Sequence, residues 1–294
     1  MRVTDAMRYA AATAQSARAA ENLLKTTRQA STGMRVERPS DDPFAWATSV
    51  AKSGQMEAMA ARRDAATRAR GDLDLAESTL ASAADIVARA KELSVQMANG
   101  DLGPAERALG AKEVTQLRQA LVGIANTRGA RGYLFGGSAT AAPPFSTAGA
   151  FVGNDDVTPL EIAEGVTIAA NPSGARAFTA AGGRDIFQDL SDLEQALTNN
   201  SVPGVQALLD PLDQDLAQMT TARGEAGLSS QRFSSAADVT TAAIDALRKI
   251  RADAVEADPT EAFSRLVEAK SAYERSLEVT KQILALSSVP RFGG

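Results

Sequence analysis

The spacing of apolar residues along the chain predicts a protein built mainly from long helices. Apolar side chains recur at alternating steps of three and four residues, which is the spacing of a helix that buries one face against another helix. The longest run of such positions, over residues 73–97, is long enough to favour a coiled coil or helical bundle over a compact globular fold. Its clearest members are Leu73, Ala76, Leu80, Ala83, Val87, Ala90, Ser94 and Met97.

Start and stop signals set the limits of the predicted helices. The first is expected from about Thr4 to Ala30, before Gly33, a residue that suits a left-handed helix end. The second begins at Asp42-Pro43, where the aspartate can cap free backbone amides and proline fits the first turn. It runs to about Ala98. Further helices are expected over 104–127 and 186–197, along a seam at 205–219, from about 229 to 257, and after Pro259.

The helices at the two ends of the chain differ in the size of the side chains along their predicted buried faces, which we call seams. The inward positions of the first helix are mostly alanine, so their burial removes little apolar area and the helix is marginal alone. The last helix carries larger residues, so we expect the two ends to pair, antiparallel or parallel, and to meet sibling molecules. The candidate assembly interface comprises Val3, Met7, Ala10, Ala14, Ala17, Leu24, Leu266, Tyr273, Leu277, Thr280 and Leu284.

The middle of the chain has a different composition. Residues 129–184 hold 10 of the 22 glycines, and turn signals separate short runs rich in β-forming residues. We expect a small β-rich insertion there, at the far tip of the bundle, entered through a buried apolar plug at Tyr133-Leu134-Phe135. The expected strands are 148–152, 158–162, 166–169 and 177–179.

These patterns predict one fold class. It is mainly α: a long antiparallel helical coiled-coil bundle built from both chain ends, with a small β-rich inserted domain. The predicted domains are the terminal helix 1–40, the first bundle segment 41–137, the insertion 138–184, the second bundle segment 185–257 and the C-terminal helix 258–294.

Composition removes most catalytic chemistry. The 294 residues include no Cys and no His, and alanine accounts for 60 of them. No nucleotide-binding, hydrolase or metal-binding motif is present. We expect Asp41-Asp42 to cap a helix and Asp155-Asp156 to lie in a solvated turn, with a cation site at 154–156 as the alternative. Trp46 and Phe44 are expected to pack at the linker corner. No catalytic, cofactor-binding or metal residue is predicted, and no cofactor.

Charge is distributed unevenly although the net charge is only −5. Residues 1–40 hold seven basic and three acidic residues, whereas 151–200 hold two basic and eight acidic ones. This indicates either solvated faces or attraction of the basic helix to an acidic neighbour during assembly. Basic residues are not interleaved with stacking aromatics, so nucleic-acid binding is not expected. Neither a membrane-spanning run nor a cleaved signal peptide is expected.

Three stretches resemble one family. Residues 29–43 are similar to the N-terminal signature of bacterial flagellins, and 272–284 resemble the C-terminal helix of that family. Residues 132–137 with Pro144-Phe145 resemble the segment that leads into the outer domain of its hook–filament junction branch. The chain departs from the family at its end, where a Pro-Arg-Phe-Gly-Gly sequence replaces an apolar run. Within residues 29–43, we expect one set of residues to form the linker between the first two helices and to cap their ends. This linker motif comprises Ser31, Thr32, Gly33, Arg35, Pro39, Ser40, Asp41, Asp42 and Pro43.

The resemblance implies a structural subunit of the bacterial flagellum that works outside the cell and performs no catalysis. It would be exported without a cleaved signal peptide, with the help of an export chaperone. It would form a ring-like homo-oligomeric layer at the junction of hook and filament, between another hook-associated protein and flagellin. A flagellin-like filament subunit is the alternative, and a secreted coiled-coil adhesin is a third possibility that the 29–43 signature argues against.

Overall fold

The computed structural model describes residues 5–287, and the side chains of 7–285. It divides into two compact units, one formed by residues 1–58 with 244–294 and the other by 59–243. Helices α2 (Pro43–Met97) and α7 (Leu209–Val255) contribute to both units. None of the described helices is both long and apolar enough to span a bilayer.

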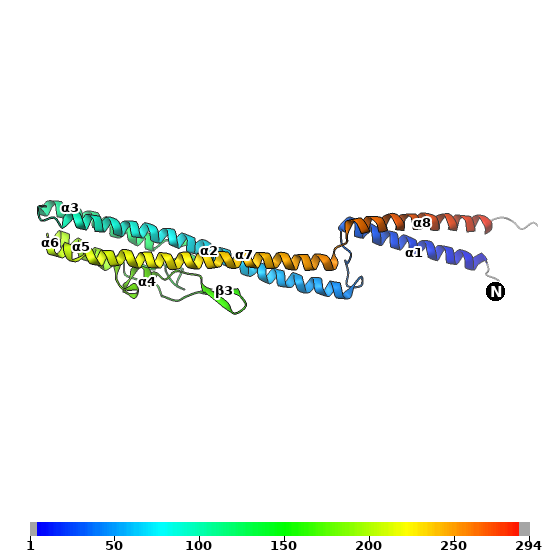
Figure 1. The fold of residues 1–294 in the computed structure, drawn as a ribbon, viewed down its shortest axis with the longest axis horizontal. Helices are drawn as coiled ribbons and strands as arrows, with labels where there is room; N and C mark the ends of the chain where they lie inside the picture. The colour runs from blue at the N-terminus through cyan, green and yellow to red at the C-terminus, as the bar shows by residue number, and fades with distance from the viewer. Residues whose placement is uncertain (1–4, 288–294) are drawn as a thin grey trace, which may run out of the picture. The chain divides into compact units, whose positions relative to one another are not determined.

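The first unit contains the paired ends of the chain. Helix α1 (Asp5–Thr32) lies antiparallel to α8 (Pro259–Ser287), as Figure 1 shows at the blue and red ends of the ribbon. This confirms the predicted pairing and selects the antiparallel arrangement. The start of α2 and the end of α7 complete the unit, and a β-bridge between Met34 and Glu256 joins the two linkers. Thr4, the predicted first residue of α1, lies outside the described residues.

The second unit is a helical bundle around one apolar core. Helices α3 (Pro104–Ala125), α5 (Ile186–Thr198) and α6 (Val202–Ala207) pack beside α2 and α7. The 3–4 spaced positions predicted on α2 are all buried, and Ala76, Leu80, Ala83, Val87 and Ala90 have no exposed surface. The prediction of a bundle seam over 73–97 is therefore confirmed.

The C-terminal half of the bundle is more continuous than expected. A helix beginning near residue 229 was predicted after a separate seam at 205–219, but α7 runs unbroken from Leu209. Only Val205 of that seam belongs to the short α6. Gly224 and Gly227 lie inside α7, with nothing near their Cβ positions. Each glycine costs about 1 kcal/mol of helix stability relative to alanine, and the packing of α7 on both sides of them outweighs this cost.

Two small antiparallel strand pairs interrupt the helices. Strands β1 (Arg128–Gly129) and β2 (Gly132–Tyr133) pair, and β3 (Pro159–Ala163) pairs with β4 (Val166–Ala169), with Leu160 opposite Ile168. The β3–β4 hairpin matches the expected strands at 158–162 and 166–169.

Two of the expected strands are absent from the described structure. The run at 148–152 makes only one bridge, between Phe145 and Phe151. The run at 177–179 belongs mostly to helix α4 (Gly174–Phe178), followed by the 3-10 turn η1 (Ala180–Gly182). The side chain of Ser173 caps α4 by accepting a hydrogen bond from the Arg176 N–H at 3.0 Å. That capping residue was the local signal for a helix, and the β-forming composition concealed it.

The insertion lies along the side of the bundle, so its predicted place at the far tip is wrong. Leu160, Ile162 and Ile168 of the hairpin pack against Leu73 and Phe233 of the long helices. The end of this unit is instead formed by the α2–α3 and α5–α6 turns, as the labels α3 and α6 in Figure 1 show. Buried Arg107 ties these turns together through hydrogen bonds to the Met97 and Asn99 carbonyls and to Asn200.

A cluster of phenylalanines joins the insertion to the helical core. Phe178 meets Phe135 edge to face at 5.2 Å between ring centroids and Phe145 at 5.3 Å. Phe187 of α5 lies 5.3 Å from Phe145. Such pairs add about 0.5–1.5 kcal/mol each beyond the burial of apolar area. Leu134 and Phe135 are buried, which confirms the predicted plug at these two positions, whereas Tyr133 is only half-buried.

Candidate assembly interface

A sharp corner after α1 is built by the predicted linker motif. Gly33 has φ +70°, and its N–H donates to the Gln29 carbonyl at 3.0 Å, which closes α1 with a left-handed cap. The chain then lies beside the linker that follows α7. The Arg35 N–H donates to the Val255 carbonyl at 2.8 Å, and the Ala257 N–H donates to the Gly33 carbonyl at 2.8 Å. The predicted cap at Gly33 is confirmed.

The two aspartates of the motif bind backbone amides. Asp41 Oδ2 accepts from the Glu37 and Arg38 N–H groups at 3.1 and 3.0 Å, and Asp42 Oδ1 accepts from the Ala45 N–H at 3.1 Å. The hydrogen bond from Glu37 is the main reason that the pKa of Asp41 is lowered, and the bond from Ala45 lowers the pKa of Asp42. Asp42 therefore caps α2 as expected, and Asp41 fixes the turn before it.

The side chain of Arg35 connects this turn to the end of α7. Its Nη1 lies 3.2 Å from Asp42 Oδ2, and its Nη2 donates to the Ala254 carbonyl at 2.6 Å. One guanidinium therefore joins the residue that caps α2 to the last turn of α7 at the corner.

The remaining motif residues have local roles. Thr32 Oγ1 donates to the Glu37 carboxylate at 2.8 Å and accepts from the Met34 N–H at 3.2 Å, while Ser31 Oγ donates to the Arg28 carbonyl at 2.9 Å. Pro39 and Ser40 are exposed in the turn, and Pro43 is the first residue of α2.

A small apolar cluster lies beneath the corner. Val36, Ala45 and Val255 are buried, and half-buried Trp46 packs against them, as predicted. The expectation that Phe44 also packs there is wrong, because its side chain is 83% exposed. Phe44 and Trp46 are separated by two positions, which lie about 200° apart around a helix, so only one of them can face the cluster.

Small residues form the contact between α1 and α8. Ala12 and Thr26 of α1 and Ala262 and Ala269 of α8 are buried. Ser16 Oγ lies 2.9 Å from Thr280 Oγ1 and donates to the Ser276 carbonyl at 3.3 Å. The two helices therefore approach closely but bury little apolar area.

The face of α1 that packs on α8 is not the predicted one. The expected inward positions Met7, Ala10, Ala14, Ala17 and Leu24 are all exposed, Met7 by 60% and Leu24 by 64%. Alanines occur on several faces of this helix, so the heptad pattern alone could not choose between them. Positions 12, 16, 19, 23, 26 and 30 have the same spacing and turn toward α8. Their serine and threonine were the overlooked signal for a close helix contact.

The predicted seam on α8 is divided between two faces. Leu266, Tyr273 and Thr280 are half-buried on the side of α1. Leu277 and Leu284 are 38% and 45% exposed. Val3 lies outside the described residues.

We call the five exposed positions 7, 10, 14, 17 and 24 the outer face of α1.

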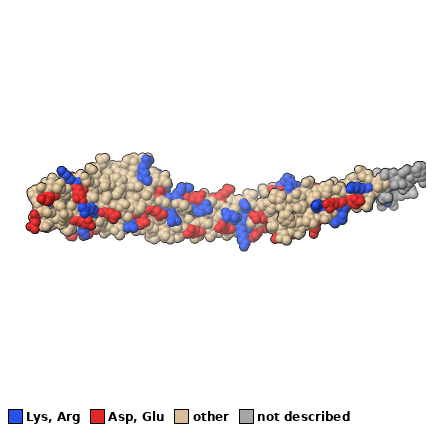
Figure 2. Space-filling view, turned by 90° about the horizontal axis from the view of Figure 1, so that it is seen from above, with Lys and Arg blue, Asp and Glu red and all other residues tan. Residues whose placement is uncertain are grey.

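The described surface offers no sign of a catalytic or metal centre. Asp155 binds Ser173 and lies 3.7 Å from Arg176, and Asp156 Oδ2 accepts from Ser138 at 2.8 Å. Both residues are exposed, as expected, but they lie in an irregular segment and not in the predicted turn. Among the described residues no group of three or more acidic side chains could hold a metal ion. On the face drawn in Figure 2, basic and acidic side chains are interspersed.

Comparison with known proteins agrees with this architecture. The profile of the bacterial flagellin N-terminal helical region matches residues 3–140, and that of the C-terminal helical region matches residues 209–289. Together they span most of the chain, including α1, α2 and α8. The chain therefore belongs to the bacterial flagellin family, as its motifs predicted.

Relatives within the family are flagellar hook-associated proteins. Flagellar hook-associated protein 3 of Salmonella typhimurium is 29% identical over 216 residues, which cover 72% of this chain and 68% of that protein. The Escherichia coli protein of the same name is 32% identical over 157 residues, 53% of this chain and 50% of the relative. The crystal structure of FlgL from Xanthomonas campestris shares the fold, with a TM-score of 0.61 at 18% identity over 68% of this chain and 99% of that chain.

These findings confirm the predicted class of function. The chain is a structural protein of the extracellular flagellum, of the hook-associated protein 3 type, and the family is not an enzymatic one. Assembly with other flagellar components follows from this class.

Proposed function

We propose that this chain is the subunit that joins hook and filament, and that the outer face of α1 is its contact with sibling copies. The observation that carries the proposal is the exposure of that face after α1 has already paired with α8. Met7 and Leu24 remain largely exposed on a helix whose internal contact is made by small residues. A helix with a weak internal contact and a free apolar face gains stability from a neighbour's surface.

The exposed half of the α8 seam extends the proposed contact. Leu277 is exposed on a helix whose other face lies on α1. Identical subunits that meet through two different faces form head-to-tail contacts, and such contacts generate rings or helical layers. A ring-like layer of copies between another hook-associated protein and flagellin is the arrangement that we propose, with an export chaperone covering the C-terminal arm before assembly.

Charge substitutions on the outer face test the proposal. Leu24→Asp places a carboxylate where the proposed contact buries an apolar side chain, and a buried unpaired charge costs several kcal/mol. In a strain that lacks the gene, Leu24→Asp and Leu277→Asp are expected to be secreted in normal amount but to leave filament monomer free in the medium and the cells non-motile. Leu24→Met keeps the apolar side chain and is the matched control, expected to restore motility.

The unfolding temperature of the purified chain distinguishes a variant that has lost the contact between subunits from one that no longer folds. Because both positions are exposed, the purified Asp variants are expected to unfold at the wild-type temperature within the error of measurement. Normal swimming with Leu24→Asp would contradict the proposed interface.

The family also contains filament subunits, because the matched profiles are those of flagellins. A filament subunit extends indefinitely when seeded, whereas a junction subunit adds a layer of limited height. Negative-stain microscopy of hook fragments incubated with purified chain distinguishes the two. Long fibres made of this chain alone would favour the filament function.

A further inference from the structure

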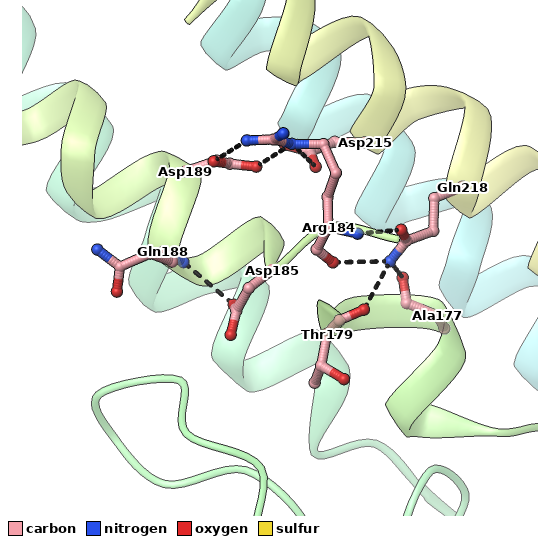
Figure 3. A network of polar contacts seen from close by, with 8 residues as sticks. All are labelled: Ala177, Thr179, Arg184, Asp185, Gln188, Asp189, Asp215 and Gln218. Atoms are coloured by element: carbon pink, nitrogen blue, oxygen red, sulfur yellow. Dashed lines mark hydrogen bonds and ion pairs between the residues drawn. The ribbon is translucent and has the colours of Figure 1, made fainter. Parts of the chain in front are cut away.

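A buried carboxylate on α7 has no hydrogen-bond partner in the described structure. Asp215 is fully buried, and neither of its carboxylate oxygens is hydrogen-bonded. The cation beside it is Arg184, whose Nε lies 3.8 Å from Asp215 Oδ1, too far for a hydrogen bond. Figure 3 shows the two side chains facing each other between α7 and the start of α5.

The guanidinium of Arg184 is already bound by another carboxylate. Its Nε donates to Asp189 Oδ2 at 2.7 Å and its Nη2 donates to Asp189 Oδ1 at 2.5 Å, and Asp189 is also buried. The two aspartates therefore compete for one positive charge. The other charged groups that act on the cluster, Asp185 and Asp192, are acidic as well. Lys91 of α2 does not relieve the imbalance, because it pairs with Asp213.

Two ionised carboxylates buried beside one cation are unfavourable, because burial removes the solvation of the charges. Burial, and then the charge of Asp189, raise the pKa of Asp215 to about 8. A metal ion does not fit there, since the guanidinium repels cations and the described residues include no group of three acidic ligands. A proton is the occupant that satisfies the cluster, because a protonated carboxyl can donate a hydrogen bond to its neighbour.

The same face of α7 holds the end of the insertion. Gln218 lies three residues after Asp215, and its Oε1 accepts from the Arg184 N–H at 2.9 Å. Its Nε2 donates to the carbonyls of Ala177, Thr179 and Arg184 at 3.3, 3.2 and 3.0 Å. Figure 3 shows these bonds fanning out from one side chain. The segment 177–185 is therefore attached to α7 at two points, the Gln218 amide and the aspartate–arginine cluster.

We propose that Asp215 and Asp189 share one proton beside Arg184, and that this proton keeps the segment 177–185, and with it the insertion, docked on α7. Loss of the proton leaves two negative charges against one guanidinium, and the segment opens so that water can solvate them. The cluster is a pH-dependent clamp that closes at low pH and loosens at high pH. It does not depend on the proposed junction function, because it acts within one chain.

Hydrogen exchange across pH tests the clamp on the full-length chain. The closed state holds the proton and the open state releases it, so opening becomes about tenfold more favourable per pH unit between the two pKa values, near 3.8 and about 8. After correction for intrinsic exchange, protection of the amides in 179–189 is expected to fall about tenfold per unit from pH 5 to 8 and then to level off.

Matched variants identify the responsible group. Asp215→Asn has the shape of the protonated acid and cannot ionise, so the pH dependence in 179–189 is expected to disappear. Asp213→Asn, on the same helix but in an exposed ion pair, is expected to keep it. A wild-type profile that is flat with pH, or an Asp215→Asn profile with the wild-type slope, would overturn the proposal.

Infrared spectroscopy gives a second readout if Asp215→Asn folds poorly. The wild-type chain is expected to show the carbonyl band of a protonated carboxylic acid at pH 6 and to lose it above pH 9. Absence of that band at pH 6 would overturn the shared proton directly.

Discussion

Single residues at the corner show how local hydrogen bonds determine both charge and backbone shape. Asp41 and Asp42 are surface carboxylates whose pKa values are lowered, chiefly by hydrogen bonds from backbone amides, with Arg35 also acting on Asp42. Gly33 supplies a backbone conformation that side chains with a Cβ disfavour. The aspartates and the glycine together make a turn that needs little buried area.

Acid is expected to loosen the corner. The folded-state pKa values of Asp41 and Asp42 lie below 3.8, so their contribution to stability is present above that pH and is lost as the pH falls through the folded values. NMR signals of the Glu37, Arg38 and Ala45 amides should shift together below pH 4. The Asp41→Asn, Asp42→Asn double variant keeps the acceptor oxygens without the charge, so persistence of the shift in it would contradict this assignment.

Backbone strain, and not a steric clash, is the reason that position 33 requires glycine. No atom lies within 4 Å of a Cβ built on Gly33, so a substitution meets no clash but must adopt φ +70°. Gly33→Val is expected to lower the stability of the α1·α8 unit by about 1–2 kcal/mol, measured by hydrogen exchange in α1. Gly33→Asn tolerates this conformation and is expected to remain near wild type. Equal exchange in wild type and Gly33→Val would show that the cap is dispensable.

At the scale of elements, the α1·α8 pair combines close approach with weak burial. The contact depends on alanine, serine and threonine, and the larger apolar residues of both helices are mostly exposed. The long bundle helices differ, since leucines and valines at their core positions, such as Leu80, Val87 and Leu212, are fully buried. The terminal pair is therefore expected to open before the bundle.

Enlarging a contact residue tests this packing. Ala269 is only 4% exposed, so Ala269→Leu is expected to push α1 and α8 apart and to destabilise the pair by about 1–3 kcal/mol. Limited proteolysis should then cleave α1 faster. Ala17→Leu adds the same atoms on the outer face and is the control, expected to leave the cleavage rate of the monomer unchanged. Equal cleavage of both variants would show that α1 does not cover Ala269.

At the scale of the whole molecule, the insertion and the helices of unit 59–243 share one core. Phe145 and Phe178 come from the insertion, and they are buried with Leu190 and Leu193 of α5. Among the described residues the insertion 138–184 contributes one short strand pair, β3–β4, too little sheet to be stable without the helices. We therefore expect it to fold together with the bundle.

Truncation of a shared phenylalanine tests this cooperativity. Phe178 is fully buried and contacts three other rings, so Phe178→Ala is expected to cost about 3–5 kcal/mol. Urea unfolding followed by circular dichroism should show one transition at lower denaturant. Val152→Ala, at an exposed position of the insertion, is the control. If the helices of Phe178→Ala unfold at the wild-type urea concentration although a protease cleaves its insertion, the insertion and the helices fold separately.

Sequence reasoning predicted the features that depend on neighbours along the chain. The limits of α2, α3 and α5, the seam on α2, the cap at Gly33 and the family signature all follow from spacing, capping and turn chemistry. It failed at residues 177–179, where β-forming composition concealed a serine-capped helix.

The sequence by itself determined most of the long helices and the corner after α1, because apolar spacing, capping residues and turn chemistry act between neighbours along the chain, and it indicated that the chain ends pair. Only the tertiary structure decided which face of α1 meets α8, since alanine occurs on several faces and offers no local preference. It alone also brought Arg184, Asp189 and Asp215 together, because a buried charge cluster depends on how distant segments pack.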